Sequence, residues 1–141
     1  MDLHEAFAAS PFMQLLGIEL LKAGDGRATG RVEFREELSA VPGGAFVQGG
    51  LVFTLADALA GAAIATRTGQ RSVTVGMRID YLSPAVTDLH AEAVVRWMGD
   101  SIAVVDVEVT DTDDEPVATA RGTFWNDTGY AVDETSAEVS S

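Results

Sequence analysis

The segment from Gly50 to about Thr66 constrains the fold most, because it is a helix candidate that is apolar on nearly every side. It is rich in leucine and alanine and lacks the alternation of polar and apolar residues that is typical of a strand. A helix of this kind has little surface to present to water, so we expect the rest of the chain to enclose it. Asp57 is the single charged residue between Glu37 and Arg67.

Strands are predicted both before and after this helix in the sequence. Four later segments alternate between apolar and polar residues with a period of two, and they are Val73–Tyr81, Leu89–Trp97, Ala103–Val109 and Ala118–Phe124. Their connections are short and carry Gly, Pro or Asp, which predicts consecutive hairpins. Two earlier strands are expected at Gly17–Leu21 and Arg27–Phe34. One buried helix and about five or six antiparallel strands predict an α+β fold, in which a curled sheet wraps around a long central helix.

The chain has the length of one domain. At 141 residues it is long enough for one hydrophobic core and too short for two. We expect this domain to cover residues 1–125, with a short helix at Leu3–Ala9 and a turn-like segment at Phe12–Leu16. The polar, acidic remainder, residues 126–141, is expected to be disordered.

Charge and composition exclude several classes of function. Twenty-two acidic and nine basic residues give a formal net charge of −13, which would repel nucleic acids and anionic membranes. The acids are scattered, as on the surface of a halophile-type protein. No apolar run approaches the roughly 18 residues of a membrane-spanning helix, and the N-terminus does not resemble a signal peptide. Without cysteine and without metal-ligand spacing, we expect a cytoplasmic protein with no metal site, and no nucleic-acid or membrane partner.

Four sequence blocks resemble the PaaI-like hotdog-fold thioesterases. They are GIEL, QGGLVFTLADALAGAA, VTVGMRIDYLSPA and a last hairpin that ends in VATARGTF. The most specific motif is a pair of glycines, an acid seven residues after the second, and a following strand that ends in Tyr-Leu-Ser-Pro. The resemblance covers about Pro11 to Phe124. It implies a hotdog fold and hydrolysis of an acyl-CoA to a free acid and coenzyme A.

The resemblance also implies roles for the paired glycines and the acid. Gly49 would hold the oxyanion with its backbone N–H at the start of the helix, where the helix dipole favours negative charge. Gly50 would let the substrate approach the backbone. Asp57 would act as general base or nucleophile. Because Asp57 lies about 10–12 Å along the axis from Gly49, a site made from both implies a homodimer, extended to a homotetramer as a dimer of dimers.

The sequence departs from the family pattern near the glycine pair. Gln48 stands where many relatives have His, and Pro42 stands where some have Asn. Gln48 can donate a hydrogen bond but cannot shuttle a proton. Thr74, near a position where some relatives carry Ser, is a candidate to hydrogen-bond Asp57. The alternative for Asp57 is a structural role, as a cap of backbone groups or as an ion-pair partner.

Substrate contacts are expected from apolar residues near the helix, namely Phe46, Leu51, Phe53 and Met77. Arg67, Arg71, Arg78 and Arg96 are candidates to meet the phosphates of coenzyme A, although solvated charge on strand edges is the simpler explanation for each. No cofactor is expected, since coenzyme A enters as part of the substrate. The alternative function is a non-catalytic acyl-CoA or acyl-ligand binder on the same fold, which the missing His and Asn favour.

Overall fold

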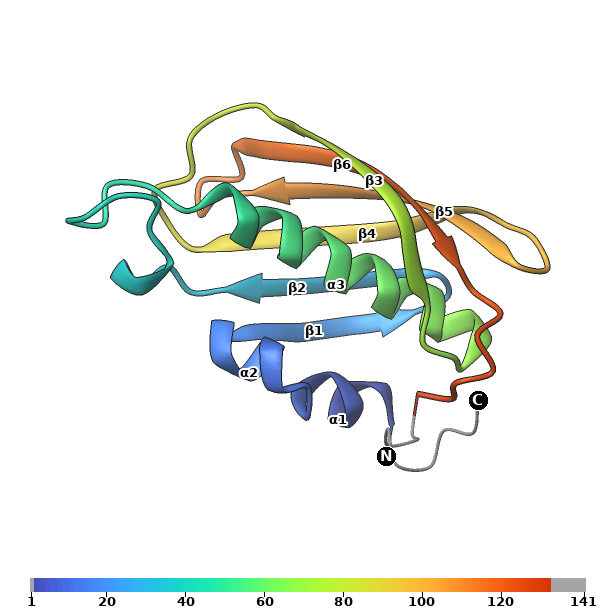
Figure 1. The fold of residues 1–141 in the computed structure, drawn as a ribbon. Helices are drawn as coiled ribbons and strands as arrows, with labels where there is room; N and C mark the ends of the chain where they lie inside the picture. Colours follow the sequence, from blue (N-terminus) through green and yellow to red (C-terminus); the bar gives the residue numbers. More distant parts are fainter. Residues whose placement is uncertain (1, 133–141) are drawn as a thin grey trace.

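The computed structural model describes residues 2–132, which form one antiparallel sheet against one long helix (Figure 1). The six strands have the spatial order β1-β2-β4-β5-β6-β3, and every neighbouring pair is antiparallel. The elements in chain order are α1 (Leu3–Ala8), α2 (Pro11–Leu16), β1 (Ile18–Gly24), β2 (Arg27–Val32), η1 (Glu36–Leu38), α3 (Gly49–Thr68), β3 (Val73–Tyr81), β4 (Leu89–Met98), β5 (Ile102–Thr110) and β6 (Pro116–Trp125). The predicted α+β class, with a curled antiparallel sheet against one long central helix, is confirmed.

The predicted hairpin between β3 and β4 is wrong. β3 pairs with β6 at one edge of the sheet, whereas β4 pairs with β2 and β5. The connection between β3 and β4 therefore crosses over β5 and β6 (Figure 1). Alternation within a strand shows which side chains face the core, but it does not identify the neighbouring strand. The consequence is that, among residues 2–132, β3 has a strand partner on one side only, and its other edge is free.

The core lies between α3 and the concave face of the sheet. Leu55, Leu59 and Ile64 of α3 are fully buried, as are Val105 and Val107 of β5. The helix crosses β2 so closely that a Cβ atom at Gly30 would lie 2.9 Å from the Leu59 side chain and 2.6 Å from a backbone oxygen of β1. Glycine at this position is therefore a steric requirement of the packing.

The helix is not enclosed on all sides within one chain, contrary to the sequence-based expectation. Phe53, Thr54, Asp57, Ala58 and Gly61 are only partly buried, and they recur every three or four residues along the helix, on the face turned away from the sheet. By length and composition alone, α3 could span a membrane, contrary to the expectation from the sequence. However, 56% of its most apolar 18-residue stretch is buried in the fold. Its apolar character is explained by core packing.

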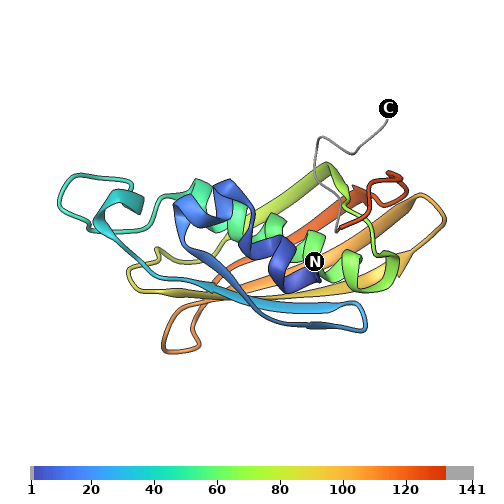
Figure 2. The same cartoon turned by 90° about the horizontal axis from the view of Figure 1, so that it is seen from below.

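The two N-terminal helices lie on the same side of the sheet as α3 (Figure 2). Asp2 caps α1 by accepting a hydrogen bond from the N–H of Glu5, and Ser10 caps α2 by accepting one from the N–H of Met13. Pro11 at the first position of α2 fits because that N–H needs no intrahelical partner. Gly17 ends α2 in the left-handed conformation. This cap turns the chain directly into β1.

Residues 126–132 belong to the folded domain, so the predicted boundary at residue 125 is too early. Asn126 is 3% exposed, and its backbone N–H donates to the carbonyl of Ser101 at 2.7 Å. Further along, the N–H of Arg71 donates to the carbonyl of Tyr130 at 2.8 Å, and the N–H of Val132 donates to that of Gly69 at 2.9 Å. The segment also docks through side-chain hydrogen bonds of Asn126 and Thr128 to the carbonyls of Gly99 and Arg71. The rest of the predicted tail, 133–141, lies outside the described residues.

Candidate active site

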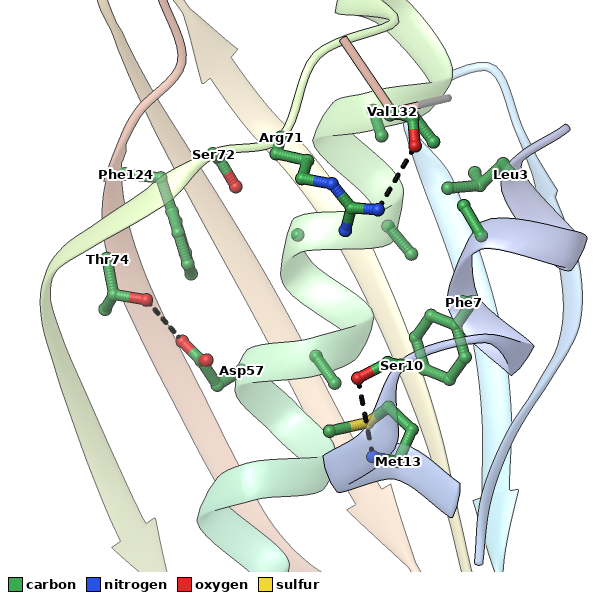
Figure 3. A pocket seen from close by; sticks show the side chains of 15 residues that line it. Leu3, Phe7, Ser10, Met13, Asp57, Arg71, Ser72, Thr74, Phe124 and Val132 are labelled. Atoms are coloured by element: carbon green, nitrogen blue, oxygen red, sulfur yellow. Dashed lines mark hydrogen bonds between the residues drawn. The ribbon is translucent and has the colours of Figure 1, made fainter. Parts of the chain in front are cut away.

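Asp57 and Thr74 are in direct contact, as the sequence predicts. The Thr74 hydroxyl donates a hydrogen bond of 2.6 Å to Oδ1 of Asp57 (Figure 3). Thr74 faces the helix because it lies opposite Phe124 in the β3–β6 register, and Phe124 is buried on the concave side. The register of β3 shifts between Thr74 and Gly76. Asp57 is half-buried and its second carboxylate oxygen has no hydrogen-bond partner among residues 2–132.

A pocket with a volume of about 220 Å³ opens beside Asp57. Its floor is formed by α3, where four small residues follow the acid: Ala58, Gly61, Ala62 and Ala65. The N-terminal helices form one wall with Leu3, Ala6, Phe7, Ser10 and Met13. The remaining lining comes from Arg71, Ser72, Thr74, Phe124 and Val132. Figure 3 shows Asp57 and Arg71 at different heights along α3, with the cavity between them. The carboxylate is therefore accessible to a small ligand.

At the start of α3, both backbone polar groups of Gly49, the predicted oxyanion-binding residue, form hydrogen bonds within the chain. Gln48 is the N-cap residue, and its side-chain oxygen accepts a hydrogen bond of 2.9 Å from the N–H of Gly49. The Tyr81 hydroxyl donates to the carbonyl of Gly49 at 2.7 Å. Burial raises the pKa of Tyr81 above its usual value. A phenol with an ordinary pKa of about 10 is already protonated at neutral pH, so the hydroxyl acts as a donor. The N–H expected to bind an oxyanion is thus occupied by the chain's own amide oxygen.

One chain does not bring Gly49 and Asp57 together. Eight residues of helix separate them, which is about 12 Å along the axis, and they line different cavities. Gly49 lines a cavity of about 390 Å³ together with Phe46 and Tyr81. This separation is the one expected from the sequence. A site that uses both groups needs a second copy of the chain.

The four apolar residues predicted to contact the acyl group do not line the pocket beside Asp57. Leu51 is 5% exposed, because its side chain turns inward. Phe46 lies near Gly49 at the far end of the helix, and Met77 packs partly against the core. Phe53 lies on the open face of α3 with Asp57. Contact between these residues and a substrate held by a second copy stays a prediction, as do the roles of Gly49, Gly50 and Gln48.

Sequence reasoning missed the N-terminal helices as pocket walls and Arg71 as a pocket residue. Arg71 is half-buried and lies at the pocket, not on a solvated strand edge. Arg78 and Arg96 lie on the convex face of the sheet, where they pair with Asp80 and Asp106. One feature of the sequence could have indicated this role. Arg71 follows the helix that carries Asp57 by only a few residues, so a chain that turns back there places the arginine over the surface of that helix.

Comparison with known proteins gives a consistent result. The family model described as "Thioesterase superfamily" matches residues 44–118, which include the glycine pair, Asp57 and Thr74. A Halobacterium salinarum protein whose name carries a provisional esterase assignment is 33% identical over 123 residues, which cover 79% of this chain and 82% of that protein.

Solved structures agree in fold and in sequence. A crystal structure of a thioesterase-superfamily protein superposes with a TM-score of 0.82 at 33% identity, covering 87% of this chain and 94% of that chain. The PaaI protein from the phenylacetic acid degradation operon of Escherichia coli superposes with a TM-score of 0.77 at 25% identity, covering 88% and 95%. These matches support hydrolysis of an ester or thioester. The chain has the hotdog fold and belongs to the thioesterase superfamily.

Proposed function

We propose that this protein is an acyl-CoA thioesterase that works in the cytoplasm as a homodimer, with the homotetramer as a further assembly. The observation that carries the proposal is the position of Asp57. Its carboxylate is oriented by Thr74 and opens onto a pocket of about 220 Å³ with largely apolar walls. A carboxylate beside an apolar pocket can act on a small acyl group that the pocket binds. No further cofactor is invoked.

In the proposed reaction, the acyl group occupies the pocket and the thioester carbonyl lies between Asp57 and Gly49 of a second copy. Asp57 accepts a proton as water attacks the carbonyl carbon, and the N–H of Gly49 stabilises the oxyanion that forms. The tetrahedral intermediate collapses and the carbon–sulfur bond breaks. The thiolate of coenzyme A leaves and takes up the proton from Asp57. The alternative course is direct attack by the carboxylate, followed by hydrolysis of the resulting anhydride.

The dimer in this proposal is supported by the free edge of β3. Val73 and Val75 on this strand are 60% and 63% exposed, and Leu82 just beyond it is 57% exposed. An exposed apolar edge strand is a template for pairing with another chain. The same strand carries Thr74, so an interface along it would place a second copy beside Asp57.

A second candidate function is a non-catalytic acyl-CoA or acyl-ligand binder. The hydrogen bond from Gly49 to Gln48 favours it, since the predicted oxyanion donor already has a partner. The two functions differ in turnover: a binder retains acyl-CoA and releases no thiol, whereas an enzyme releases coenzyme A.

The test is release of free thiol from a panel of short-chain, medium-chain and aromatic acyl-CoA substrates, at low and at multimolar salt, because an acidic surface can require salt for folding. Asp57→Asn keeps the size of the side chain and removes its charge. We expect kcat to fall by about 10² or more, in the range for a lost acid–base group, with an unchanged or higher thermal midpoint. Near-normal turnover by this variant would remove Asp57 from the mechanism.

A further inference from the structure

The pocket beside Asp57 is a slot with a carboxylate near one end and a guanidinium near the other. Asp57 and Ala65 are eight residues apart on the slot floor, which corresponds to about 12 Å. Arg71 enters the slot from the loop that follows α3, beyond Asp57 along the helix (Figure 3). Between the two charged groups the floor consists only of alanine and glycine. A bound acyl group would therefore extend from Asp57 toward Arg71.

The size of the slot limits the length of the acyl group. An apolar protein cavity of about 150 Å³ admits benzene, and this slot has about 220 Å³. That volume suits one aromatic ring with a short substituent, or a chain of about six carbons. A group of that size would reach the guanidinium with its far end.

Arg71 retains hydrogen-bonding capacity at this end of the slot. One Nη donates to the carbonyl of Val132 at 3.1 Å, and the guanidinium lies 5.3 Å from the centre of the Tyr130 ring. The other Nη has no hydrogen-bond partner among residues 2–132, and no carboxylate of those residues lies within ion-pair distance of the guanidinium. The Nε is also without a partner there, but it is buried and does not reach the slot. A guanidinium carries five N–H donors. A half-buried cation with unused donors is stabilised by an anionic oxygen.

We infer that Arg71 determines acyl specificity, and that the preferred substrate is the thioester of a short acyl group with a carboxylate at its far end. This inference rests on the proposed thioesterase function and names its substrate class. Asp57 acts at the thioester carbonyl, and Arg71 binds the distal carboxylate. The arginine is a specificity residue and takes no part in bond breaking.

A matched pair of substrates tests the inference. Hexanoyl-CoA and the monothioester of hexanedioic acid with coenzyme A have the same chain length and differ in the terminal carboxylate. We expect kcat/KM to be about 10- to 100-fold higher for the dicarboxylic thioester, the range for a hydrogen bond to a charged group. Arg71→Met should abolish this preference, mainly through KM, while hexanoyl-CoA is still hydrolysed. Arg71→Lys should keep part of it.

Two controls separate specificity from structure. Arg78→Met removes a cation from the convex face and should leave the substrate ratio unchanged. If Arg71 serves only to hold residues 126–132 through Val132 and Tyr130, Arg71→Met and Arg71→Lys should slow both substrates equally, and the inference is overturned. Equal turnover of both substrates by the unmodified protein overturns the inference alone. Release of thiol from neither substrate overturns the proposed function, and the inference with it.

Discussion

The Thr74 hydroxyl lies 2.6 Å from Oδ1 of Asp57 and joins the edge strand of the sheet to the central helix. Seventeen residues separate the two in sequence. The hydrogen bond fixes one carboxylate oxygen and leaves the other directed at the pocket. A carboxylate that must meet a water molecule or a carbonyl carbon in a defined orientation depends on such a support.

Replacement of Thr74 tests this support. Thr74→Val keeps the shape of the side chain and removes the hydroxyl, so we expect kcat to fall about 10- to 100-fold, the range for one hydrogen bond to a charged group, with little change in KM. Thr74→Ser keeps the hydroxyl and should retain most of the activity. Steady-state kinetics of both variants give the result. Equal activity of the Val and Ser variants would show that the bond does not orient the acid.

Gln48 is expected to compete with the substrate for the N–H of Gly49. In the proposed reaction the thioester oxygen replaces the Gln48 side-chain oxygen, which lies 2.9 Å from this nitrogen. Gln48→Ala should therefore raise kcat/KM, by up to about tenfold for one hydrogen bond no longer displaced, and lower stability by about 0.5–2 kcal/mol for the lost cap. Gln48→Glu keeps the acceptor and should not raise the rate. A loss of activity in Gln48→Ala would instead assign this side chain to substrate binding.

The free edge of β3 predicts that a substitution which prevents dimerisation also abolishes activity. Val75→Lys places a charge on the edge strand, which opposes pairing with a second chain. We expect a monomer by sedimentation at micromolar concentration, without thioesterase activity. Leu21→Lys, on β1 at the opposite edge of the sheet, is the matched control and should leave both properties unchanged. An active, monodisperse monomer would contradict a site shared between two copies.

The docked C-terminal segment predicts a difference between two truncations. A chain that ends at Val132 keeps every contact described for residues 126–132, whereas one that ends at Trp125 loses them. The free energy of unfolding of the shorter chain should be lower by roughly 3 kcal/mol, because several backbone and side-chain hydrogen bonds of about 1 kcal/mol each are lost. Denaturant titration of the two chains measures the difference. Equal stability would show that the segment adds nothing to the fold.

The arginines on the convex face predict acid sensitivity. A hydrogen bond from Arg121 lowers the pKa of Asp106, and a second from Arg96 acts in the same direction. Because the folded pKa is below the unfolded value of about 3.9, the stabilisation is present above that value and is lost as the pH falls through the folded pKa. Asp106→Asn should lower the thermal midpoint at pH 7. The difference in thermal midpoint between this variant and the unmodified protein should disappear as the pH falls below about 4.

The exposed acid Asp113 provides the control for this experiment. Asp113→Asn, in the turn between β5 and β6, removes the same charge without a basic partner among the described residues. It should leave the midpoint at pH 7 nearly unchanged. A pH-independent gap for Asp106→Asn would show that the ion pairs do not account for the stabilisation.

The sequence predicted the features that depend on local pattern. Period-two alternation located β3 to β6, and the apolar run located α3, because burial of side chains follows from the backbone geometry of each element. The motif from Gln48 to Asp57, together with Thr74, predicted a contact that the structure contains. The family and the hotdog fold followed from the same residues.

Features that depend on contacts between distant segments were not predictable in this way. The position of β3 at the sheet edge depends on its pairing with β6, and alternation does not encode a partner. The docking of residues 126–132 depends on backbone hydrogen bonds and on bonds from the Asn126 and Thr128 side chains to distant carbonyls, and the identity of those partners is not encoded in the local sequence. Arg71 and the walls from α1 and α2 come together only when three separate segments fold onto α3.

The run of small residues on the floor of the slot makes its depth adjustable in steps of one helical turn. A Cβ atom at Gly61 would lie 3.5 Å from the Ser72 hydroxyl, which is an ordinary contact, so an alanine fits there and narrows the slot midway. A larger side chain at Ala65 would close its far end and leave Asp57 and Thr74 in place. Substitutions at these positions would change the length of the acyl group that the slot accepts, while the reacting groups stay the same.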